Sequence, residues 1–332
     1  MWFKNLVGFE EISPDYVREH ISVEGTKLVS KVNGKSYQCG SLEIPTLSEL
    51  IEQAPPKEAF KDKIRVREVV GNVQKLHCDP SNKYALFQAA SQFNLLEMTG
   101  PYITPEQGVD IYENDQTQGP ACAIACGAGT IYRNYYVPVN GRQGQSANKQ
   151  IDCLNLIGKK LKNDELQLWE MSNGYALLNQ AGLLNINAQL SKLSYSEREA
   201  LKGNLKIGIQ WNTEVTLNDS KHTVSQAYCA ALPLAYSKVE ANSCEMFTGI
   251  ILEATYEATL YAALINLDKM NCNKVYLTLV GGGAFGNEPD WILESMFDAI
   301  NKFKNSPLDV RIVSYRNSNP KVQELINKID NN

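Results

Sequence analysis

The fold is decided by the stretch Val275-Tyr-Leu-Thr-Leu-Val-Gly-Gly-Gly-Ala-Phe-Gly-Asn287, in which an apolar strand runs directly into a glycine-rich turn. A helix is expected to follow at 289–303. The turn contains four glycines, Gly281, Gly282, Gly283 and Gly286. Glycine can adopt positive φ angles and lets backbone N–H groups approach an anion closely. The helix adds the positive end of its dipole. The stretch therefore predicts a phosphate site, against the alternative of an ordinary strand-to-helix connection.

Strand and helix patterns alternate along the chain from Ile64 onward. Strands are expected at 65–76, 85–90, 206–217, 225–232, 275–280 and 309–314, and helices at 119–135, 247–267 and 289–303. This alternation predicts an α/β fold, a sheet with helices on its faces. Ligands of such sheets bind beyond the carboxyl ends of the strands, where the glycine-rich turn lies.

The first 60 residues form a separate N-terminal extension. Residues 27–39 alternate in polarity and turn at Asn33-Gly34, which predicts a hairpin, and 46–53 is expected to be a short helix. The run Ala54-Pro-Pro-Lys57 breaks that helix. The sequence thus predicts an extension over 1–60 that packs on or beside a main domain over 61–330.

Composition narrows the class of protein. The chain has 332 residues, 43% of them hydrophobic and 21% charged, with a net charge of −5, so it is globular and has no basic surface for nucleic acid. Acidic residues interrupt the N-terminus before a secretory segment forms, and no apolar run reaches the length of a membrane span. A cytoplasmic protein is expected. The eight cysteines lack a C-x-x-C pair and the three histidines lack ligand spacing, so no metal is expected.

Two further segments show a resemblance to a known family. Leu86-Phe-Gln-Ala-Ala-Ser-Gln-Phe-Asn94 is a strand ending in small and amide residues, and a glycine-led helix follows at 118–134. This order resembles the ADP-ribose-binding macrodomains, in which such a strand leads through a ribose-facing loop to such a helix and a late strand carries the diphosphate loop. The resemblance implies a macrodomain-like three-layer α/β/α fold with a mixed sheet, to which this chain adds its N-terminal extension and a helical insertion at about 138–204.

The resemblance also implies which residues bind ADP-ribose. Asn72 stands where the family has an acid that binds the adenine amino group; its carbonyl would accept that hydrogen bond without charge assistance, a difference on the order of 1 kcal/mol. Phe285 is expected to cover the ribose and the diphosphate. The full predicted binding set is Asn72, Val73, Gln88, Ser91, Gln92, Gln118, Gly119, Gly281, Gly282, Gly283, Ala284, Phe285, Gly286 and Asn287.

Four phrases are similar to one divergent branch of the family. They are 117–123, 132–134, 209–215 and 281–287. That branch includes a bacterial effector that removes ADP-ribose from an arginine of ubiquitin. The resemblance implies an ADP-ribosylhydrolase that acts on arginine-modified protein such as ubiquitin. The protein is expected to be a monomer and to need no cofactor.

Cleavage of an N-glycosidic bond requires carboxylates that stabilise positive charge and orient water. Asp115 precedes the glycine-led helix, and Asp110 lies in the same loop. Glu214 interrupts an apolar, β-branched strand, where a buried acid is costly unless it has a partner or a function, and Asp219 follows that strand. The predicted catalytic set is Asp115 as water-orienting or ribose-binding carboxylate, Glu214 as charge stabiliser, and Asp110 and Asp219. Solvated surface acids are the alternative for each.

Two other functions compete with hydrolysis. A non-catalytic ADP-ribose reader is favoured by Asn72 and Asn212, which stand where acids would be expected. A dinucleotide-binding enzyme is disfavoured, because 281–286 is not a G-x-G-x-x-G opening a first βαβ unit, and no Walker A loop is present. Large aromatics such as Trp211 and Tyr315 are candidates for stacking on adenine, although packing in the core is the commoner role.

Overall fold

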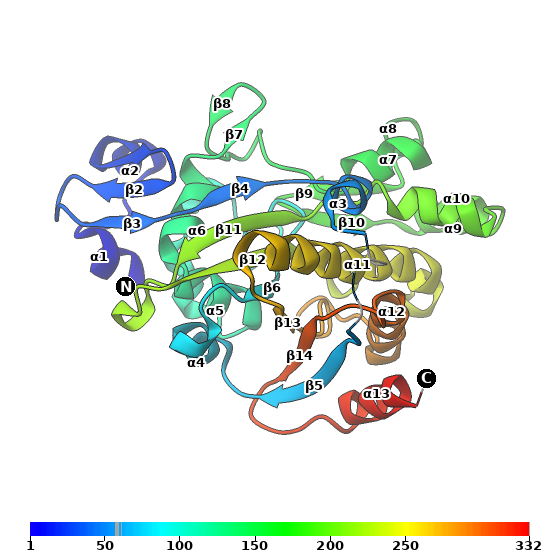
Figure 1. Ribbon diagram of the computed structural model, residues 1–332. Coiled ribbons are helices and arrows are strands. Elements are labelled where there is room, and N and C mark those ends of the chain that lie inside the picture. Colours follow the sequence, from blue (N-terminus) through cyan, green and yellow to red (C-terminus); the bar gives the residue numbers. More distant parts are fainter. Residues whose placement is uncertain (57–59, 61, 332) are drawn as a thin grey trace.

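A mixed β-sheet forms the centre of the protein in a computed structural model, which describes residues 1–56, 60 and 62–331 (Figure 1). Within the described residues its strand order is β4-β11-β12-β6-β13-β14-β5. Strands β4, β11 and β12 pair antiparallel, and the pairs from β12 to β5 are parallel. The strand bounds are Ser41–Glu43 (β4), Gly208–Glu214 (β11), Thr223–Cys229 (β12), Leu86–Ala90 (β6), Lys274–Leu277 (β13), Asp309–Ser314 (β14) and Arg65–Val70 (β5).

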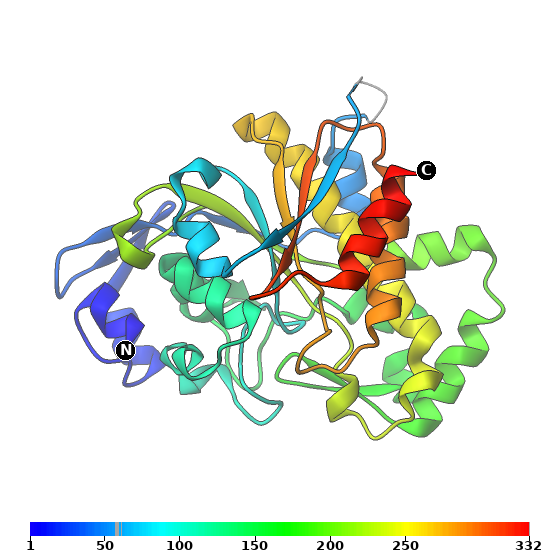
Figure 2. The same ribbon diagram turned by 90° about the horizontal axis from the view of Figure 1, so that it is seen from below.

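Helices cover both faces of the sheet (Figure 2). On one face the long α11 (Glu245–Met270) contacts β12, β6 and β13, and around it pack α3 (Leu47–Gln53), α9 (Gln180–Leu190), α10 (Tyr195–Lys202) and α12 (Pro289–Lys302). The last helix, α13 (Pro320–Asp330), packs on α12 and β5. On the other lie α4 (Val73–Cys78), α5 (Gln118–Ala125) and α6 (Gly127–Tyr135). Successive side chains of β6 point to opposite faces of the sheet. Phe87 stacks on His77 of α4, and its neighbour Gln88 donates a hydrogen bond to Thr259 of α11. The predicted three-layer α/β/α fold with a mixed sheet is confirmed.

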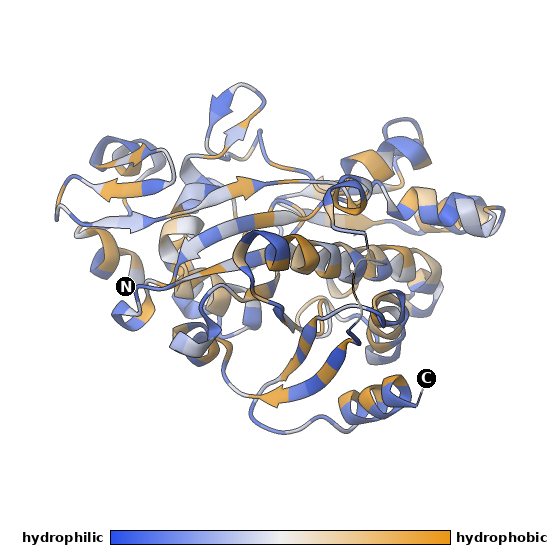
Figure 3. Cartoon of the chain, in the orientation of Figure 1, coloured by the Kyte–Doolittle hydropathy of each residue, from blue (hydrophilic) through white to orange (hydrophobic). Residues whose placement is uncertain are grey.

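The edge strand β5 is shorter than predicted. The sequence pattern suggested a strand over 65–76, but β5 ends at Val70 and α4 begins at Val73. The reason is local: Asn72 Oδ1 accepts hydrogen bonds from the backbone N–H groups of Gln74 (2.8 Å) and Lys75 (3.3 Å), which caps the helix. Figure 3 shows alternating hydrophilic and hydrophobic bands along β5 itself, as expected for a strand with one exposed face.

The extension packs on the core and also adds a strand to it. It contains α1 (Trp2–Val7), α2 (Pro14–His20) and the antiparallel strands β1 (Ile21–Glu24), β2 (Lys27–Ser30) and β3 (Ser36–Gln38). The hairpin predicted at Asn33-Gly34 joins β2 to β3, with Gly34 at φ 69°. Strand β4 then pairs with β11 of the main sheet. The predicted break after 53 runs into Lys57, which lies outside the described residues, so the domain boundary stays a prediction.

A second apolar core joins the extension to the main domain. It contains Phe3, Val7 and Val17 of the extension together with Tyr112 and Ile131 of the main domain. Glu11 of the extension also forms hydrogen bonds to the main domain: its carboxylate accepts from the Tyr135 hydroxyl (2.6 Å) and from the Asp110 N–H (2.6 Å). The extension therefore fixes the acidic loop that precedes α5.

The insertion over 138–204 contains hairpins as well as the expected helices. Its elements are β7 (Pro138–Val139), β8 (Arg142–Gln143), α7 (Asn155–Leu161), α8 (Asn163–Leu166), β9 (Trp169–Ser172), β10 (Tyr175–Leu178), α9 and α10. Short 3-10 helices occur in the chain at Pro80–Asn82, Pro105–Gln107, Asp110–Asn114, Leu217–Asp219, Leu234–Tyr236 and Ala241–Cys244. No helix within the described residues is long and apolar enough to cross a membrane.

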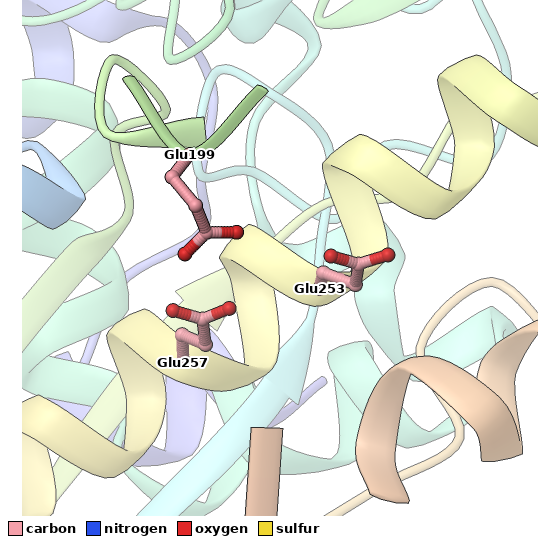
Figure 4. A group of neighbouring side chains, drawn as sticks. All are labelled: Glu199, Glu253 and Glu257. Carbon is pink, nitrogen blue, oxygen red and sulfur yellow. The ribbon is translucent and has the colours of Figure 1, made fainter. Parts of the chain in front are cut away.

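A buried lysine fastens the insertion to α11. Lys202 of α10 is 1% exposed, and its Nζ lies 2.7 Å from Glu199, 2.9 Å from Glu253 and 2.5 Å from Glu257. Figure 4 shows the three carboxylates facing one another across α10 and α11. Burial alone would lower the pKa of Lys202, but these carboxylates raise it above its ordinary value. With its ammonium group among them, the cluster acts as an ion-pair network between the helices.

Replacing Lys202 by methionine is expected to lower the free energy of unfolding by about 3 kcal/mol, because three carboxylates lose their buried partner. The loss stays at the low end of the range for broken buried pairs, since Lys302 Nζ still lies 2.7 Å from Glu199 and 2.8 Å from Glu257. Urea unfolding followed by circular dichroism measures the change. The matched control is Lys321→Met, whose Nζ lies 2.6 Å from Asp290 with side chains 49% and 78% exposed. Exposed pairs contribute roughly 0–1 kcal/mol, so equal losses in the two variants would contradict the prediction.

Candidate functional site

A cleft opens at the carboxyl ends of β6 and β13. It consists of two adjoining cavities of about 140 and 650 Å³, and both are lined by Asp115, Thr117, Gln118, Thr278 and Gly283. The larger one lies within the range of roughly 300–1,000 Å³ that is typical of small-molecule sites. The two segments singled out in the sequence, the glycine-rich turn and the start of α5, form its opposite walls. This is the expected place for a ligand of a parallel sheet.

The glycine-rich turn presents free backbone donors. Gly281 (φ 83°) and Gly286 (φ 70°) adopt the left-handed conformation, and a Cβ on Gly281 would approach that of Ala231 to 2.6 Å. The N–H groups of Gly283, Ala284 and Phe285 donate to no acceptor in the described part of the chain. Gly281, Gly283, Ala284 and Phe285 line the smaller cavity. Adjacent unpaired N–H groups in such a turn are suited to an anion.

The other predicted residues of the turn stabilise its conformation. Asn287 is 3% exposed, and its Nδ2 donates to the Leu232 carbonyl at 2.8 Å. Its backbone N–H donates to Gly281 O (3.0 Å), and that of Gly286 to Gly283 O (3.0 Å). Gly282, Gly286 and Asn287 are absent from the described lining of the cleft. These three residues shape the turn.

Gln118 fixes the opposite wall. Its Oε1 accepts from the Ala90 N–H (2.8 Å) and its Nε2 donates to the Gln88 carbonyl (2.8 Å), so the side chain pairs with the end of β6 as a strand would. Ser91 and Gln92 line the cleft beside it. Gln92 also closes its own loop, because its amide bonds the N–H (2.9 Å) and carbonyl (3.1 Å) of Met98.

Gln88 is not among the residues that line the described part of the cleft. It is 1% exposed and faces α11, where its Nε2 donates to Thr259 Oγ1 at 2.8 Å, and its Oε1 accepts from the Thr278 N–H at 3.2 Å. The strand alternation that turns Phe87 toward α4 turns Gln88 away from the cleft. Gln88 therefore ties β6 to its neighbours in the core.

The larger cavity holds the residues predicted for adenine. Asn72, Val73 and Tyr315 line it, together with Trp2 of the extension. The expectation that the Asn72 carbonyl accepts from adenine is not supported, because that oxygen already accepts two N–H groups of α4. Tyr315 is 60% exposed, with Arg316 Cζ 5.0 Å from its ring centre, whereas Trp211 is 7% exposed and does not line the cleft within the described residues.

The four predicted catalytic carboxylates, all within the described residues, are not brought together. Asp115 lines both cavities, held at the head of α5 by the Thr117 N–H, which donates to Oδ1 at 2.8 Å. Asp110 lies behind the cleft and accepts from the Phe3 N–H of the extension at 3.2 Å. Burial raises the pKa of Asp110, and the hydrogen bond from Phe3 opposes that rise. Asp110 thus joins the extension to the loop.

Glu214 and Asp219 lie at the far end of β11. Glu214 Oε2 accepts from the Gln38 N–H of β3 at 2.8 Å, and burial raises the pKa of Glu214. The partner that a half-buried acid requires is therefore a backbone amide of the extension. Asp219 is exposed and pairs with Lys221 at 3.1 Å. Neither residue is among the described lining of the cleft.

The structure adds a carboxylate that the sequence analysis missed. Glu97, in the loop after β6, is 2% exposed and lines the smaller cavity. A Cβ on Gly119 would overlap the Ala90 carbonyl and Glu97 Oε2, so this position of α5 requires glycine for the close approach of the acid. Glu97 stands alone in the apolar run Asn94-Leu-Leu-Glu-Met98, the same signal that singled out Glu214.

Two tyrosines complete the wall beside Glu97. Tyr175 comes from β10 of the insertion, and its hydroxyl donates to the Met98 carbonyl at 2.8 Å. Its ring centroid lies 5.1 Å from that of Tyr236 and 5.2 Å from that of Phe285. Phe285 is therefore part of an aromatic group at one end of the glycine-rich turn. Periodicity in the sequence carried no signal for this contact between the insertion and the turn.

Comparison with known proteins gives likeness of structure only. No protein-family model matches the sequence, and no curated protein matches it. Among solved structures, the chain is similar to poly(ADP-ribose) glycohydrolase from Thermomonospora curvata bound to the inhibitor ADP-HPD, with a TM-score of 0.45 and 10% identity over 99% of this chain and 98% of that one. It is also similar to poly(ADP-ribose) glycohydrolase from Deinococcus radiodurans in complex with ADP-ribose, with a TM-score of 0.42 and 9% identity over 87% and 94%. At these values the likeness says nothing about chemistry, which depends on the residues of the cleft.

Proposed function

We propose that this protein binds ADP-ribose carried by a modified protein and hydrolyses the N-glycosidic bond that links it to an arginine side chain. One observation supports this most: a single cleft contains both the unpaired N–H groups at Gly283, Ala284 and Phe285 and the carboxylate of Asp115. The same cleft therefore offers donors for an anion and a carboxylate for acid–base chemistry.

In the proposed complex the diphosphate lies on the glycine-rich turn. The proximal ribose lies between Phe285 and the start of α5, and the adenosine extends into the larger cavity toward Val73 and Tyr315. Backbone donors suit a diphosphate because they neutralise charge at fixed positions. The exposed face of Tyr315 suits a purine ring.

For the reaction, Asp115 is the proposed water-orienting base. As C1″ of the proximal ribose develops positive charge, water attacks it and Asp115 accepts a proton from that water. The Thr117 N–H that donates to Asp115 Oδ1 at 2.8 Å holds this carboxyl group in place at the head of α5. The support for arginine as the modified residue is the sequence resemblance.

The second candidate function is a non-catalytic ADP-ribose reader, favoured by the capping role of Asn72 in place of an acid. Incubation of the purified protein with arginine-ADP-ribosylated ubiquitin or an arginine-modified peptide separates the two functions. We expect free ADP-ribose to be released. Binding of ADP-ribose by calorimetry without any release would favour the reader, and absence of binding would remove both proposals.

A further inference from the structure

We infer that Glu97 is the general acid of the cleft, which gives its proton to the guanidine nitrogen as that nitrogen leaves the ribose. This inference rests on the proposed hydrolase function and deepens it. The leading observation is positional. Glu97 is a nearly fully buried acid that lines the same small cavity as Asp115 and the glycine-rich turn.

The backbone around Glu97 is fixed. Its N–H donates to the Tyr112 hydroxyl at 3.0 Å, and the next residue, Met98, is held on both sides by the Gln92 amide. The carboxyl group lies against the Cα of Gly119 in the first turn of α5. Glu97 Oε1 has no hydrogen-bond partner in the described part of the chain. A buried polar atom without a partner is costly, so its retention in the wall of a cleft points to use by a ligand.

The nearest cation does not neutralise Glu97. Arg133 of α6 is fully buried, with Nε donating to the Leu95 carbonyl (3.1 Å), Nη2 donating to Thr130 Oγ1 (3.1 Å) and Cζ 3.5 Å from the Tyr228 ring centre. Within the described residues no ion pair joins it to Glu97. Its Nη1 has no hydrogen-bond partner within the described residues, so Arg133 acts on Glu97 through its charge and not through a direct bond.

Burial raises the pKa of Glu97 well above its ordinary value, the Arg133 charge opposes this rise, and the Asp115 charge adds to it. Titratable or charged groups face Glu97 from every surrounding element: Tyr112, Asp115, Cys122, Arg133, Tyr175 and Tyr228. Burial also raises the pKa of the tyrosines and of Cys122, which keeps them neutral. The two carboxyl groups lie in unequal environments, and in the proposed reaction Glu97 gives a proton and Asp115 accepts one.

The C1″–N bond to the arginine side chain breaks, and its electron pair goes to nitrogen, which takes the proton of Glu97. The water oxygen bonds to C1″ and loses a proton to Asp115. The products are ADP-ribose and a free arginine side chain, and exchange with solvent returns a proton to Glu97 and removes one from Asp115.

Leaving-group dependence tests this role. A guanidine is strongly basic, so a proton donor assists its departure as the C1″–N bond breaks, whereas an acidic phenol leaves as its anion. We expect Glu97→Gln to lower kcat on an arginine-modified peptide by on the order of 10²–10⁴-fold. On ADP-ribose joined through C1″ to 4-nitrophenol its kcat should stay near that of the wild type. The affinity for ADP-ribose, measured by calorimetry, should be retained, and Glu324→Gln on the exposed face of α13 is the matched control.

The pH profile is the second readout and requires no variant. Glu97 must be protonated to act as the acid. As far as this group is concerned, wild-type activity on the arginine substrate should be highest at low pH and should fall as the pH rises through the raised pKa of Glu97. The nitrophenyl substrate should lack this fall. Equal loss on both substrates in the variant, or the same alkaline fall on both in the wild type, would overturn the inference. A wild type that binds ADP-ribose but cleaves neither substrate would instead refute the proposed hydrolase function itself.

Discussion

Replacement of Asp115 by asparagine should abolish most hydrolysis and leave ADP-ribose binding in place. The amide keeps the shape of the side chain and can still accept from the Thr117 N–H, but it cannot take a proton from water. Loss of a positioned base typically costs 10²–10⁴-fold, so we expect kcat to fall by roughly that factor. Steady-state release of ADP-ribose from a saturating arginine-modified peptide measures kcat, and calorimetry measures binding.

The matched control for this variant is Asp110→Asn. Asp110 lies in the same loop, but its Oδ1 accepts from the Phe3 N–H, a role that an amide oxygen can fill. We therefore expect its kcat to stay close to the wild-type value. A large fall in Asp110→Asn together with an active Asp115→Asn would reverse the assignment of the two carboxylates.

Replacement of Gly283 by valine should remove ADP-ribose binding while the fold is retained. A Cβ at Gly283 meets no described atom within 4 Å, and this residue does not adopt a positive φ, so the new side chain projects into the cleft without strain. There it would cover the free N–H groups of the turn. Affinity should fall about 100-fold or more, the effect of losing two bonds to charged groups at roughly 1.5–3 kcal/mol each.

Gly100→Val is the control for that variant. A Cβ at Gly100 also meets no described atom within 4 Å, and Gly100 does not line the cleft within the described residues. Calorimetric titration with ADP-ribose and a thermal unfolding curve for each variant separate lost binding from lost stability. Retained affinity in a folded Gly283→Val protein would show that the diphosphate does not lie on this turn.

Local signals in the sequence predicted much of the fold. Strand β13, the glycine-rich turn and α12 follow one another along the chain, so hydrophobic pattern and glycine content are enough to place them. The pairing of this turn with the start of α5 followed from the family resemblance. The cap at Asn72 was also visible, since an Asn before a helix is a start signal, but the β-branched residues before it favoured a longer strand.

The catalytic candidates could not be sorted in the same way. Glu97 and Glu214 are both single acids in apolar runs, and the sequence does not say what the extension or the insertion will cover. In the structure the extension supplies the Gln38 amide that satisfies Glu214, whereas Glu97 faces a cavity. Contacts between segments far apart along the chain made that distinction. The same holds for Tyr175, which reaches the cleft from the insertion.

One cleft is proposed both to bind ADP-ribose and to cleave it from a protein. The most direct test is to incubate the wild-type protein with arginine-ADP-ribosylated ubiquitin and follow both products by mass spectrometry. The proposal predicts free ADP-ribose and unmodified ubiquitin in equal amounts over many turnovers. Ubiquitin that remains modified, in the presence of protein shown by calorimetry to bind ADP-ribose, would contradict it.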